Sequence, residues 1–306
     1  MIPFYSKRET GGGLKMFAYV KLLINNIFIT CFFKYSIISV RVFTCLLLLY
    51  ITPSWANNLN DGHIHYNKDV WNDLSPKQVF SYLTENGINR AIVFSTPTAG
   101  TEKLYKFSPQ RVIPFLMPYR VVRDRFTWHS DQTMVDYVKQ QLSTGIYKGF
   151  GEFHLFKEHK DTPVIRQLMQ LVADHKIMLS AHADGETIET LIEMQPEVSI
   201  IWAHCGMDQP VEDVSRMLAQ YPNLFCELSF RYNMFDEQDK LLPQWKTLLE
   251  QYSKRFILGM DTYIPRRWAS LPENTYFARQ WLSQLQPDTK KLIGSGNIDR
   301  MFPIKN

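Results

Sequence analysis

The chain has 306 residues, 45% of them hydrophobic and 21% charged, with 34 Lys and Arg against 30 Asp and Glu. Residues 1–56 hold six of these bases and one of the acids, so residues 57–306 carry 28 bases and 29 acids. The excess of positive charge therefore belongs to the N-terminal segment, and the rest of the chain lacks the basic surplus typical of nucleic-acid-binding proteins. Four cysteines, two of them in the first 56 residues, exclude a small disulfide-dependent domain.

The first 56 residues have the composition of an export signal. Their apolar run at 42–51 (VFTCLLLLYI) follows Lys34 and Arg41 and precedes a Ser-Trp-Ala sequence at 54–56. A basic segment, an apolar stretch of about 7–15 residues and small residues at the cleavage positions indicate a secretory signal peptide. The run is shorter than the roughly 20 apolar residues of a membrane helix. We therefore predict cleavage after Ala56, a periplasmic or secreted protein and no remaining membrane span. An uncleaved anchor is the alternative.

Residues 57–306 alternate between strand and helix patterns. Strand-like apolar runs lie at 61–66, 90–95, 112–119, 148–155, 177–183, 198–204, 224–230 and 256–260. Amphipathic helices are predicted at 76–86, 133–143, 164–172, 186–194, 211–220 and 243–252, whereas the link after residue 95 is only weakly helical. Strands alternating with helices imply parallel βαβ units. Eight such units predict a single α/β domain over 57–306, a closed (β/α)₈ or TIM barrel.

Polar residues gather where the predicted strands end. The catalytic residues of such barrels lie at the C-terminal ends of the strands, so these positions are candidates for the active site. They are His63 and His65 on the first strand, Glu152 and His154 on the fourth, His182 on the fifth, His204 on the sixth and Asp261 after the eighth. Because His63 and His65 are two residues apart on a strand, both can face the barrel axis and bind one ion.

The residue types at these positions indicate a metal site. A single histidine at a strand end is usually a hydrogen-bonded structural residue, but here four strands bring histidines and an aspartate to the same pole. Burying them together without a cation would be costly. Imidazole and carboxylate are ligands that zinc and related divalent ions prefer. We therefore predict one or two divalent ions, with zinc expected, held by His63, His65, His182, His204, Asp261 and Glu152.

This set of residues resembles the amidohydrolase superfamily, in particular its amidohydrolase-related branch of hydrolases and decarboxylases. The family's His-x-His falls on His63 and His65, its later strand-end histidines on His182 and His204, and its last-strand aspartate on Asp261. The sequence at 294–302 (GSGNIDRMF) resembles the family's closing segment, so the resemblance extends from the first predicted strand nearly to the C-terminus. It implies a TIM barrel with metal-dependent chemistry.

Glu152 leaves the number of ions open. Many family members have a lysine, often carboxylated, that bridges two metals at the end of the fourth strand, but Lys148 lies too early on its strand for this role. A glutamate bridges the ions in TatD-type deoxyribonucleases, and their Gly-Glu-Ile-Gly-Leu-Asp sequence is only partly matched here by Gly-Glu-Phe-His-Leu-Phe. In the alternative interpretation, Glu152 accepts a hydrogen bond from a histidine ligand and orients it.

Three further residues are candidates for binding the substrate. Alternation along the seventh strand predicts Glu227, Ser229 and Arg231 on the side of the barrel axis, with Arg231 at the mouth. Arg120 closes the third strand, and His154 follows Glu152 on the fourth. A guanidinium at the mouth can hold a substrate carboxylate with two hydrogen bonds, so we expect a small anionic substrate. For each arginine, a salt bridge at the rim is the alternative.

The chemistry expected of this site is hydrolysis of an amide, ester or lactone bond. A divalent ion held by neutral imidazoles lowers the pKa of its water from 15.7 toward about 7. Asp261 can accept the proton and pass it to the leaving group, and His204 either binds a second ion or polarises the carbonyl. A TatD-like deoxyribonuclease and a decarboxylase or hydratase on the same barrel are the alternatives.

The charge of residues 57–306 also indicates which molecules the protein binds. We expect a small-molecule substrate and no nucleic acid, because the nearly balanced charge of residues 57–306 does not favour a phosphate backbone. A homo-oligomer stays open. Export would permit a disulfide between Cys205 and Cys226, but two cysteines at this spacing do not by themselves predict one.

Overall fold

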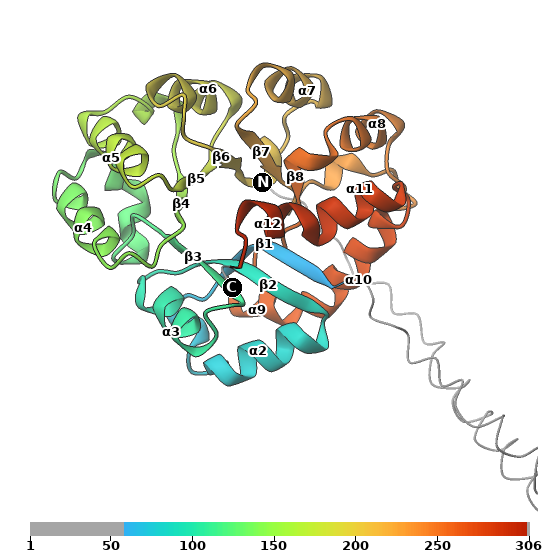
Figure 1. The fold of residues 1–306 in the computed structure, drawn as a ribbon, viewed down its shortest axis with the longest axis horizontal. Coiled ribbons are helices and arrows are strands. Elements are labelled where there is room, and N and C mark those ends of the chain that lie inside the picture. The colour runs from blue at the N-terminus through green and yellow to red at the C-terminus, as the bar shows by residue number, and fades with distance from the viewer. Residues whose placement is uncertain (1–57, 305–306) are drawn as a thin grey trace, which may run out of the picture. The chain divides into compact units, whose positions relative to one another are not determined.

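The computed structural model describes residues 58–304 of the chain. The signal peptide predicted for residues 1–56 lies outside this range. Eight strands form one parallel sheet in the order β1-β2-β3-β4-β5-β6-β7-β8, and helices surround it (Figure 1). The predicted (β/α)₈ barrel is confirmed. Within residues 58–304, no helix is both long and apolar enough to cross a membrane.

The strands lie within a few residues of their predicted positions. They are β1 (Leu59–His65), β2 (Ile88–Phe94), β3 (Val112–Leu116), β4 (Gly149–His154), β5 (Met178–His182), β6 (Ile200–Trp202), β7 (Leu224–Glu227) and β8 (Phe256–Ile257). The last three strands end earlier than the apolar pattern predicts. As a result His204, Ser229 and Asp261 lie in loops that follow strands rather than on the strands.

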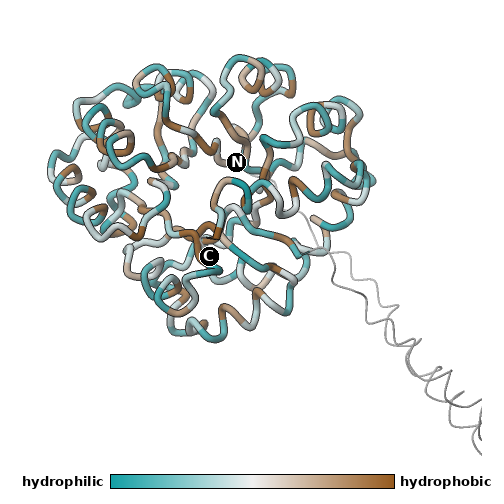
Figure 2. Tube along the Cα trace, viewed as in Figure 1, coloured by the Kyte–Doolittle hydropathy of each residue, from teal (hydrophilic) through white to brown (hydrophobic). Residues whose placement is uncertain are grey.

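Helices connect the strands and cover the outside of the barrel. They are α2 (Pro76–Glu85), α3 (Ala99–Phe107), α4 (Thr133–Leu142), α5 (Pro163–Asp174), α6 (Gly185–Met194), α7 (Val211–Gln220) and α8 (Pro243–Gln251), followed after β8 by α9 (Pro265–Ala269), α10 (Leu271–Leu282), α11 (Pro287–Lys291) and α12 (Asn297–Met301). The weakly helical link after Ser95 contains α3, whose Leu104 is buried. Hydrophobic residues recur along the strands and alternate with hydrophilic ones around the helices (Figure 2), as expected for helices that bury one face.

Short-range signals set where the helices begin. Ser75 and Gln78 form a capping box at the start of α2. The side chains of Thr162 and Asp184 accept hydrogen bonds from backbone N–H groups in the first turns of α5 and α6. Each cap satisfies a donor that the helix itself leaves unpaired, so the loop at the C-terminal end of the preceding strand has a defined end.

Contacts between β1 and the segment after β8 close the barrel. The backbone N–H of Gly62 donates to Leu258 O at 2.7 Å, and that of Asp261 donates to His63 O at 2.8 Å. A side chain at Gly62 would collide with Leu258 O, since a Cβ there would lie 2.8 Å from it. The close approach therefore requires glycine, and it brings the His-x-His pair beside Asp261.

The C-terminal segment packs beneath the barrel, at the N-terminal ends of β1 and β2 (Figure 1). Asn60 Nδ2 donates to Asp299 Oδ1 at 2.8 Å. Arg90 donates to the same oxygen at 2.9 Å and to Phe302 O at 2.7 Å. These contacts give the closing GSGNIDRMF segment a structural role at the pole opposite to the histidines.

A disulfide joins Cys205 to Cys226, with a Cα–Cα distance of 4.7 Å. It connects the loop after β6, which carries His204, to strand β7, which carries Glu227. The spacing of the two cysteines in the sequence did not predict this pairing, because only the neighbouring positions of β6 and β7 bring them together.

Candidate active site

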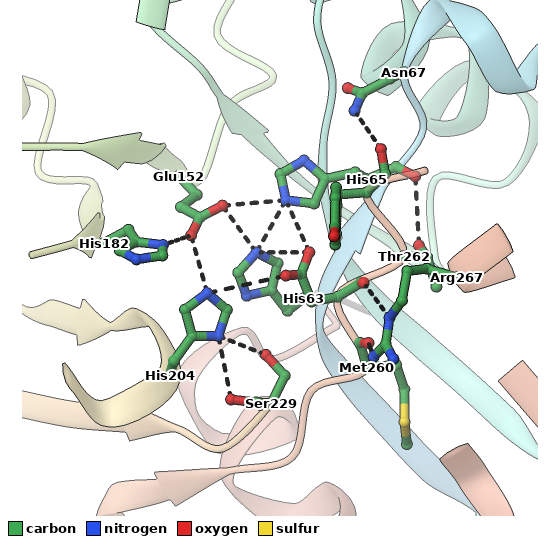
Figure 3. A network of polar contacts seen from close by, with 12 residues as sticks. His63, His65, Asn67, Glu152, His182, His204, Ser229, Met260, Thr262 and Arg267 are labelled. Atoms are coloured by element: carbon green, nitrogen blue, oxygen red, sulfur yellow. Dashed lines mark hydrogen bonds and ion pairs between the residues drawn. The ribbon is translucent and has the colours of Figure 1, made fainter. Parts of the chain in front are cut away.

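Four histidines from two strands and one loop surround the carboxylate of Glu152 at the C-terminal pole of the barrel (Figure 3). His63 Nε2 and His65 Nε2 lie 3.1 Å and 3.2 Å from Glu152 Oε2. His182 Nδ1 and His204 Nε2 lie 3.2 Å and 3.4 Å from Oε1. The structure therefore brings together residues that the sequence placed only at the ends of separate strands.

Asp261 completes this cluster from the loop after β8. Its Oδ1 lies 3.4 Å from His65 Nε2 and 3.6 Å from His63 Nε2, and its Oδ2 lies 3.9 Å from His204 Nε2. Oδ1 is buried and accepts no hydrogen bond from residues 58–304. All six predicted metal ligands thus share one site.

Asp61 and Arg267 hold this part of the site in place. Asp61 Oδ1 accepts hydrogen bonds from the backbone N–H groups of His63 and Met260, each at 3.0 Å. Arg267 Nη2 donates to Met260 O at 2.7 Å. Burial raises the pKa of Asp61 to about 8. One carboxyl group therefore fixes the start of the His-x-His pair relative to Asp261, a role that sequence reasoning did not assign to Asp61.

Glu227 lies behind the cluster and orients two of its histidines. Its Oε2 accepts hydrogen bonds from His63 Nδ1 at 2.8 Å and from Ser229 Oγ at 3.0 Å, and the backbone N–H of His204 donates to it at 3.2 Å. Burial alone would raise the pKa of Glu227, but His63 and His204 hold that pKa at about 2. Alternation along β7 predicted the axial position of Glu227 and Ser229, which the structure shows.

The hydrogen bonds on the outer nitrogens show that the cluster fits a metal ion. His63 Nδ1 faces Glu227, and His204 Nδ1 faces Ser229 O at 3.2 Å and Ser229 Oγ at 2.8 Å. A neutral imidazole that donates from Nδ1 has its lone pair on Nε2. Both Nε2 atoms point at carboxylate oxygens, an arrangement that is repulsive unless a proton or a metal ion lies between them.

The charge of the site leads to the same conclusion. Burial lowers the pKa of His63, but Glu152, Asp261 and Glu227 together raise it well above its usual value. Such a shift reports a local excess of negative charge that a divalent ion would neutralise. The ligand atoms form sets within 4.8 Å of one another, namely His63–His65–Asp261, His63–Glu152–His204 and Glu152–His154–His182. His63 and Glu152 each belong to two of these sets, and of the two only Glu152 has two oxygens, one facing His63 and His65 and the other facing His182 and His204.

Arg231 does not face the mouth of the barrel. Its side chain is 2% exposed. The guanidinium donates to the carbonyl oxygens of Cys205, Met207 and Gln209 and lies 4.4 Å from the ring of Trp245. The prediction that Arg231 binds a substrate carboxylate is therefore wrong, because its side chain is buried away from the cavity and its Nη atoms donate to backbone carbonyls.

The wrong prediction for Arg231 has a local cause. Strand β7 ends at Glu227, and Phe230 has a φ of +59°. Alternation of side chains holds only while the backbone stays extended, so it does not carry beyond this turn. Phe230 lines the cavity above the cluster and Arg231 turns away from it.

Arg120 forms the rim salt bridge that was its alternative. Its Nε lies 3.2 Å from Asp124 Oδ2 and its Nη2 lies 2.5 Å from Asp131 Oδ2, while Nη1 donates to Thr133 Oγ1 at 2.9 Å. Because the loop after β3 folds back on itself, these partners lie beside Arg120. Arg120 is not among the residues that line the cavity, so the prediction that it contacts the substrate is wrong.

His154 lies where a substrate-contacting residue was predicted. It lines the cavity, and its ring stacks against that of His182 with centroids 4.4 Å apart. The backbone N–H of His154 donates to Tyr119 Oη at 2.8 Å, and the same oxygen lies 3.4 Å from His154 Nδ1. Burial lowers the pKa of His154 to about 4. A neutral ring therefore faces the cavity near neutral pH.

A cavity of about 830 Å³ opens above the cluster. His65, Glu152, His182, His204 and Asp261 lie on its surface. Other lining residues come from loops after the strands and include Lys68, Tyr119, Arg125, Met207, Phe230 and Tyr263. Sequence reasoning missed these residues because they belong to irregular loops, where no periodic pattern shows which side chain faces inward.

Replacing Glu227 with glutamine should weaken metal binding by about 10-fold to 100-fold, because His63 Nδ1 would lose the carboxylate that fixes its orientation. The dissociation constant can be measured by competition with a chromophoric chelator. The matched control is Glu189→Gln, which removes a carboxylate on α6 that pairs with Arg216 on the surface. Equal affinities in Glu227→Gln and wild type would contradict the orienting role.

Comparison with known proteins identifies the family. Residues 131–304 match the family model described as Amidohydrolase. This match covers more than half of the chain, which belongs to the amidohydrolase family and is an enzyme of hydrolase type. No match was found among curated proteins.

Solved structures share the fold at low sequence identity. A protein of Acinetobacter baumannii, described as a probable 2-pyrone-4,6-dicarboxylic acid hydrolase, is 14% identical with a TM-score of 0.56, covering 81% of this chain and 100% of its own. An amidohydrolase of Burkholderia multivorans is 13% identical with a TM-score of 0.55, covering 81% and 99%. A TatD homologue of Escherichia coli K12 is 10% identical with a TM-score of 0.53, covering 81% and 99%. These similarities indicate the same barrel.

Proposed function

We propose that this enzyme hydrolyses an amide, ester or lactone bond of a small molecule with the help of a divalent metal ion. The observation that supports the proposal is the convergence of Nε2 lone pairs and carboxylate oxygens on the surface of a cavity. When bound, a divalent ion supplies a Lewis acid and lowers the pKa of water. Zinc is the ion we expect, because histidine and carboxylate are its usual ligands in catalytic sites. The ligands would be His63, His65, His182, His204, Asp261 and Glu152.

Asp261 is the proposed proton carrier. It lines the cavity, and its carboxylate lies 3.4–3.9 Å from the Nε2 atoms of His65 and His204, beside the place where a metal-activated water would be held. It can take a proton from the attacking water and deliver it to the leaving group. His204 is held by Ser229 with Nε2 toward the cluster, where it serves as a ligand or polarises the substrate carbonyl.

The comparisons support a hydrolase and leave a second candidate. The Acinetobacter baumannii protein described as a pyrone dicarboxylic acid hydrolase has the same fold, which favours including lactones among the substrates to be tested. The position of Glu152 at the centre of the cluster resembles the glutamate of TatD-type deoxyribonucleases, so DNA hydrolysis is the alternative. Decarboxylation or hydration on the same barrel is a further alternative.

The test is an assay of the metal-loaded protein against lactones, esters, amides and single-stranded DNA, before and after chelation. We expect turnover of one small-molecule class, loss of that turnover with chelator, and recovery when zinc is restored. Cleavage of DNA alone would favour the TatD-like alternative. Hydrolysis that persists after complete removal of metal would contradict the proposed mechanism.

The number of ions gives a separate prediction. We expect two ions per chain, because the two oxygens of Glu152 face different pairs of histidines, and Glu152→Gln should retain only one of them. Mass spectrometry of the purified protein under native conditions would count the ions. The matched control is Glu158→Gln, on the exposed surface of the next loop. One ion in both wild type and Glu152→Gln would place Glu152 outside the ligand set.

Export is proposed on two observations. The sequence of residues 1–56 has the features of a signal peptide, and the Cys205–Cys226 disulfide is typical of an oxidising compartment. Protein isolated from the cell envelope or the medium should begin at Asn57 and carry the disulfide, as measured by intact mass with and without reductant. A mature chain that retains residues 42–51 would contradict cleavage after Ala56.

A further inference from the structure

The cavity above the cluster has a cationic side and an apolar side. Arg125 lines it from the loop after β3, next to Val122, and Lys68 lines it from the loop after β1, next to Asp69. Met207, Phe230 and Tyr263 line it from the loops after β6, β7 and β8. The strands follow one another in order around the barrel, so β7 is four strands from β3 and lies across the centre from it (Figure 1). Arg125 and Phe230 therefore face the metal cluster from opposite sides.

The two cations have no acidic partner in the part of the chain that the structure describes. The Arg125 guanidinium lies 4.5 Å from the ring centroid of Phe126, which leaves its N–H donors free of carboxylates. Arg120, by contrast, is paired with two aspartates on the same loop. Unpaired cations on the wall of a catalytic cavity favour an anionic group on the ligand, and a guanidinium suits a carboxylate.

The apolar side continues outward onto the surface. Met207 is 37% and Tyr263 is 41% exposed, while Phe230 packs against His204 at 5.6 Å and under Arg267 at 4.4 Å. Met207, Tyr232 and Tyr263 are the large hydrophobic side chains among residues 58–304 that are exposed in the loops after β6, β7 and β8. Exposed apolar surface beside a cavity marks a place where an apolar ligand group binds.

We propose that the substrate is amphiphilic, with a carboxylate held by Arg125 and an apolar acyl or aryl group on Met207, Phe230 and Tyr263. The scissile carbonyl lies between these ends, over the histidine cluster. The cavity of about 830 Å³ is near the upper end of the roughly 300–1,000 Å³ typical of small-molecule sites, which suits a substrate longer than a simple lactone. This inference rests on the proposed hydrolytic function for the position of the carbonyl.

Binding can be tested without catalysis by using alkoxyacetates, which carry a carboxylate and an alkyl chain but no scissile acyl bond. Calorimetry of the metal-loaded full chain should show tighter binding from methoxyacetate to octyloxyacetate, by about fourfold for each methylene group that becomes buried. The neutral alkoxyacetamides should bind at least about tenfold more weakly, as expected for a lost charge-assisted contact of about 1.5–3 kcal/mol.

Two variants test which residues of the cavity bind the carboxylate and which bind the alkyl chain. Arg125→Ala should remove the preference for carboxylate over amide, and the matched control Arg123→Ala, an exposed arginine on the same loop that does not line the cavity, should keep it. Tyr263→Ser should weaken the dependence on chain length. Its control is Tyr232→Ser, another exposed tyrosine at this pole that does not line the cavity.

The same two ends can be followed in turnover with acylated glycines and glycolates, from acetyl to octanoyl, and their neutral amides. A rise of kcat/KM with both chain length and charge would support the inference. Turnover that depends on neither chain length nor charge would overturn the inference of an amphiphilic substrate, and so would alkoxyacetate binding that depends on neither. Both results would leave the hydrolase proposal standing. Graded alkoxyacetate binding without hydrolysis of any acyl compound would support the amphiphilic site and contradict the hydrolytic function.

Discussion

Replacing His63 and His65 together with alanine is expected to leave the protein without stoichiometric metal and to reduce hydrolysis by at least about 10³-fold, since the Lewis acid supplies several kcal/mol of transition-state stabilisation. The two rings present Nε2 atoms 3.0 Å apart toward Glu152 and Asp261. Losing both removes two ligands that β1 supplies side by side. Elemental analysis of the purified variant and the rate on the identified substrate measure the two effects.

The control for this variant is the double replacement of His159 and His175 with alanine. Both are outside the cluster, His159 in the loop after β4 and His175 at the exposed end of α5. Metal content and rate should stay near those of the wild type in the control. Full metal occupancy in the variant lacking His63 and His65 would show that the ligand set is wrong.

The second large effect is expected from Asp261→Asn, which should lower kcat by about 10²-fold to 10⁴-fold while most of the metal is retained. Asparagine keeps the shape of the side chain but cannot take a proton from water. The histidines and Glu152 remain in place to hold the ion. Metal content, kcat and KM measured on the same preparation separate proton transfer from metal binding.

Asp208→Asn serves as the control for Asp261→Asn. Asp208 is an exposed aspartate in the loop after β6, on the same pole of the barrel but not on the cavity wall. Its replacement should leave kcat unchanged. If Asp261→Asn kept near-normal turnover with full metal, the proton-carrying role of Asp261 would have to be withdrawn.

The fold could be predicted because its signals are periodic. Apolar runs of five to eight residues alternate with amphipathic segments, and this alternation identifies parallel βαβ units without any knowledge of contacts. The predicted ends of the strands and helices were less accurate. The pattern extended β7 to Phe230, for example, whereas the strand stops at Glu227 because the backbone turns there. Apolar residues continue into the loop since the loop is also buried.

The metal cluster could be predicted because topology places it. Every strand of a parallel barrel delivers its last residues to one pole, so histidines far apart in the sequence meet there. Arg231 was placed wrongly because its direction depends on a single φ angle, at Phe230. Lys68 and Arg125 were missed because the sides of a cavity depend on how irregular loops fold, and no residue spacing encodes that.

The contact that closes the barrel also decides when an active site can exist. Asp61 and Met260 meet across 199 residues of sequence, and the His-x-His pair meets Asp261 at the same junction. The two halves of the site are therefore made at widely separated times during synthesis, and no growing chain that stops before the last strand can assemble it. If the chain is exported before it folds, the cytoplasm never contains an assembled site, and activity begins only after the complete polypeptide has reached its destination.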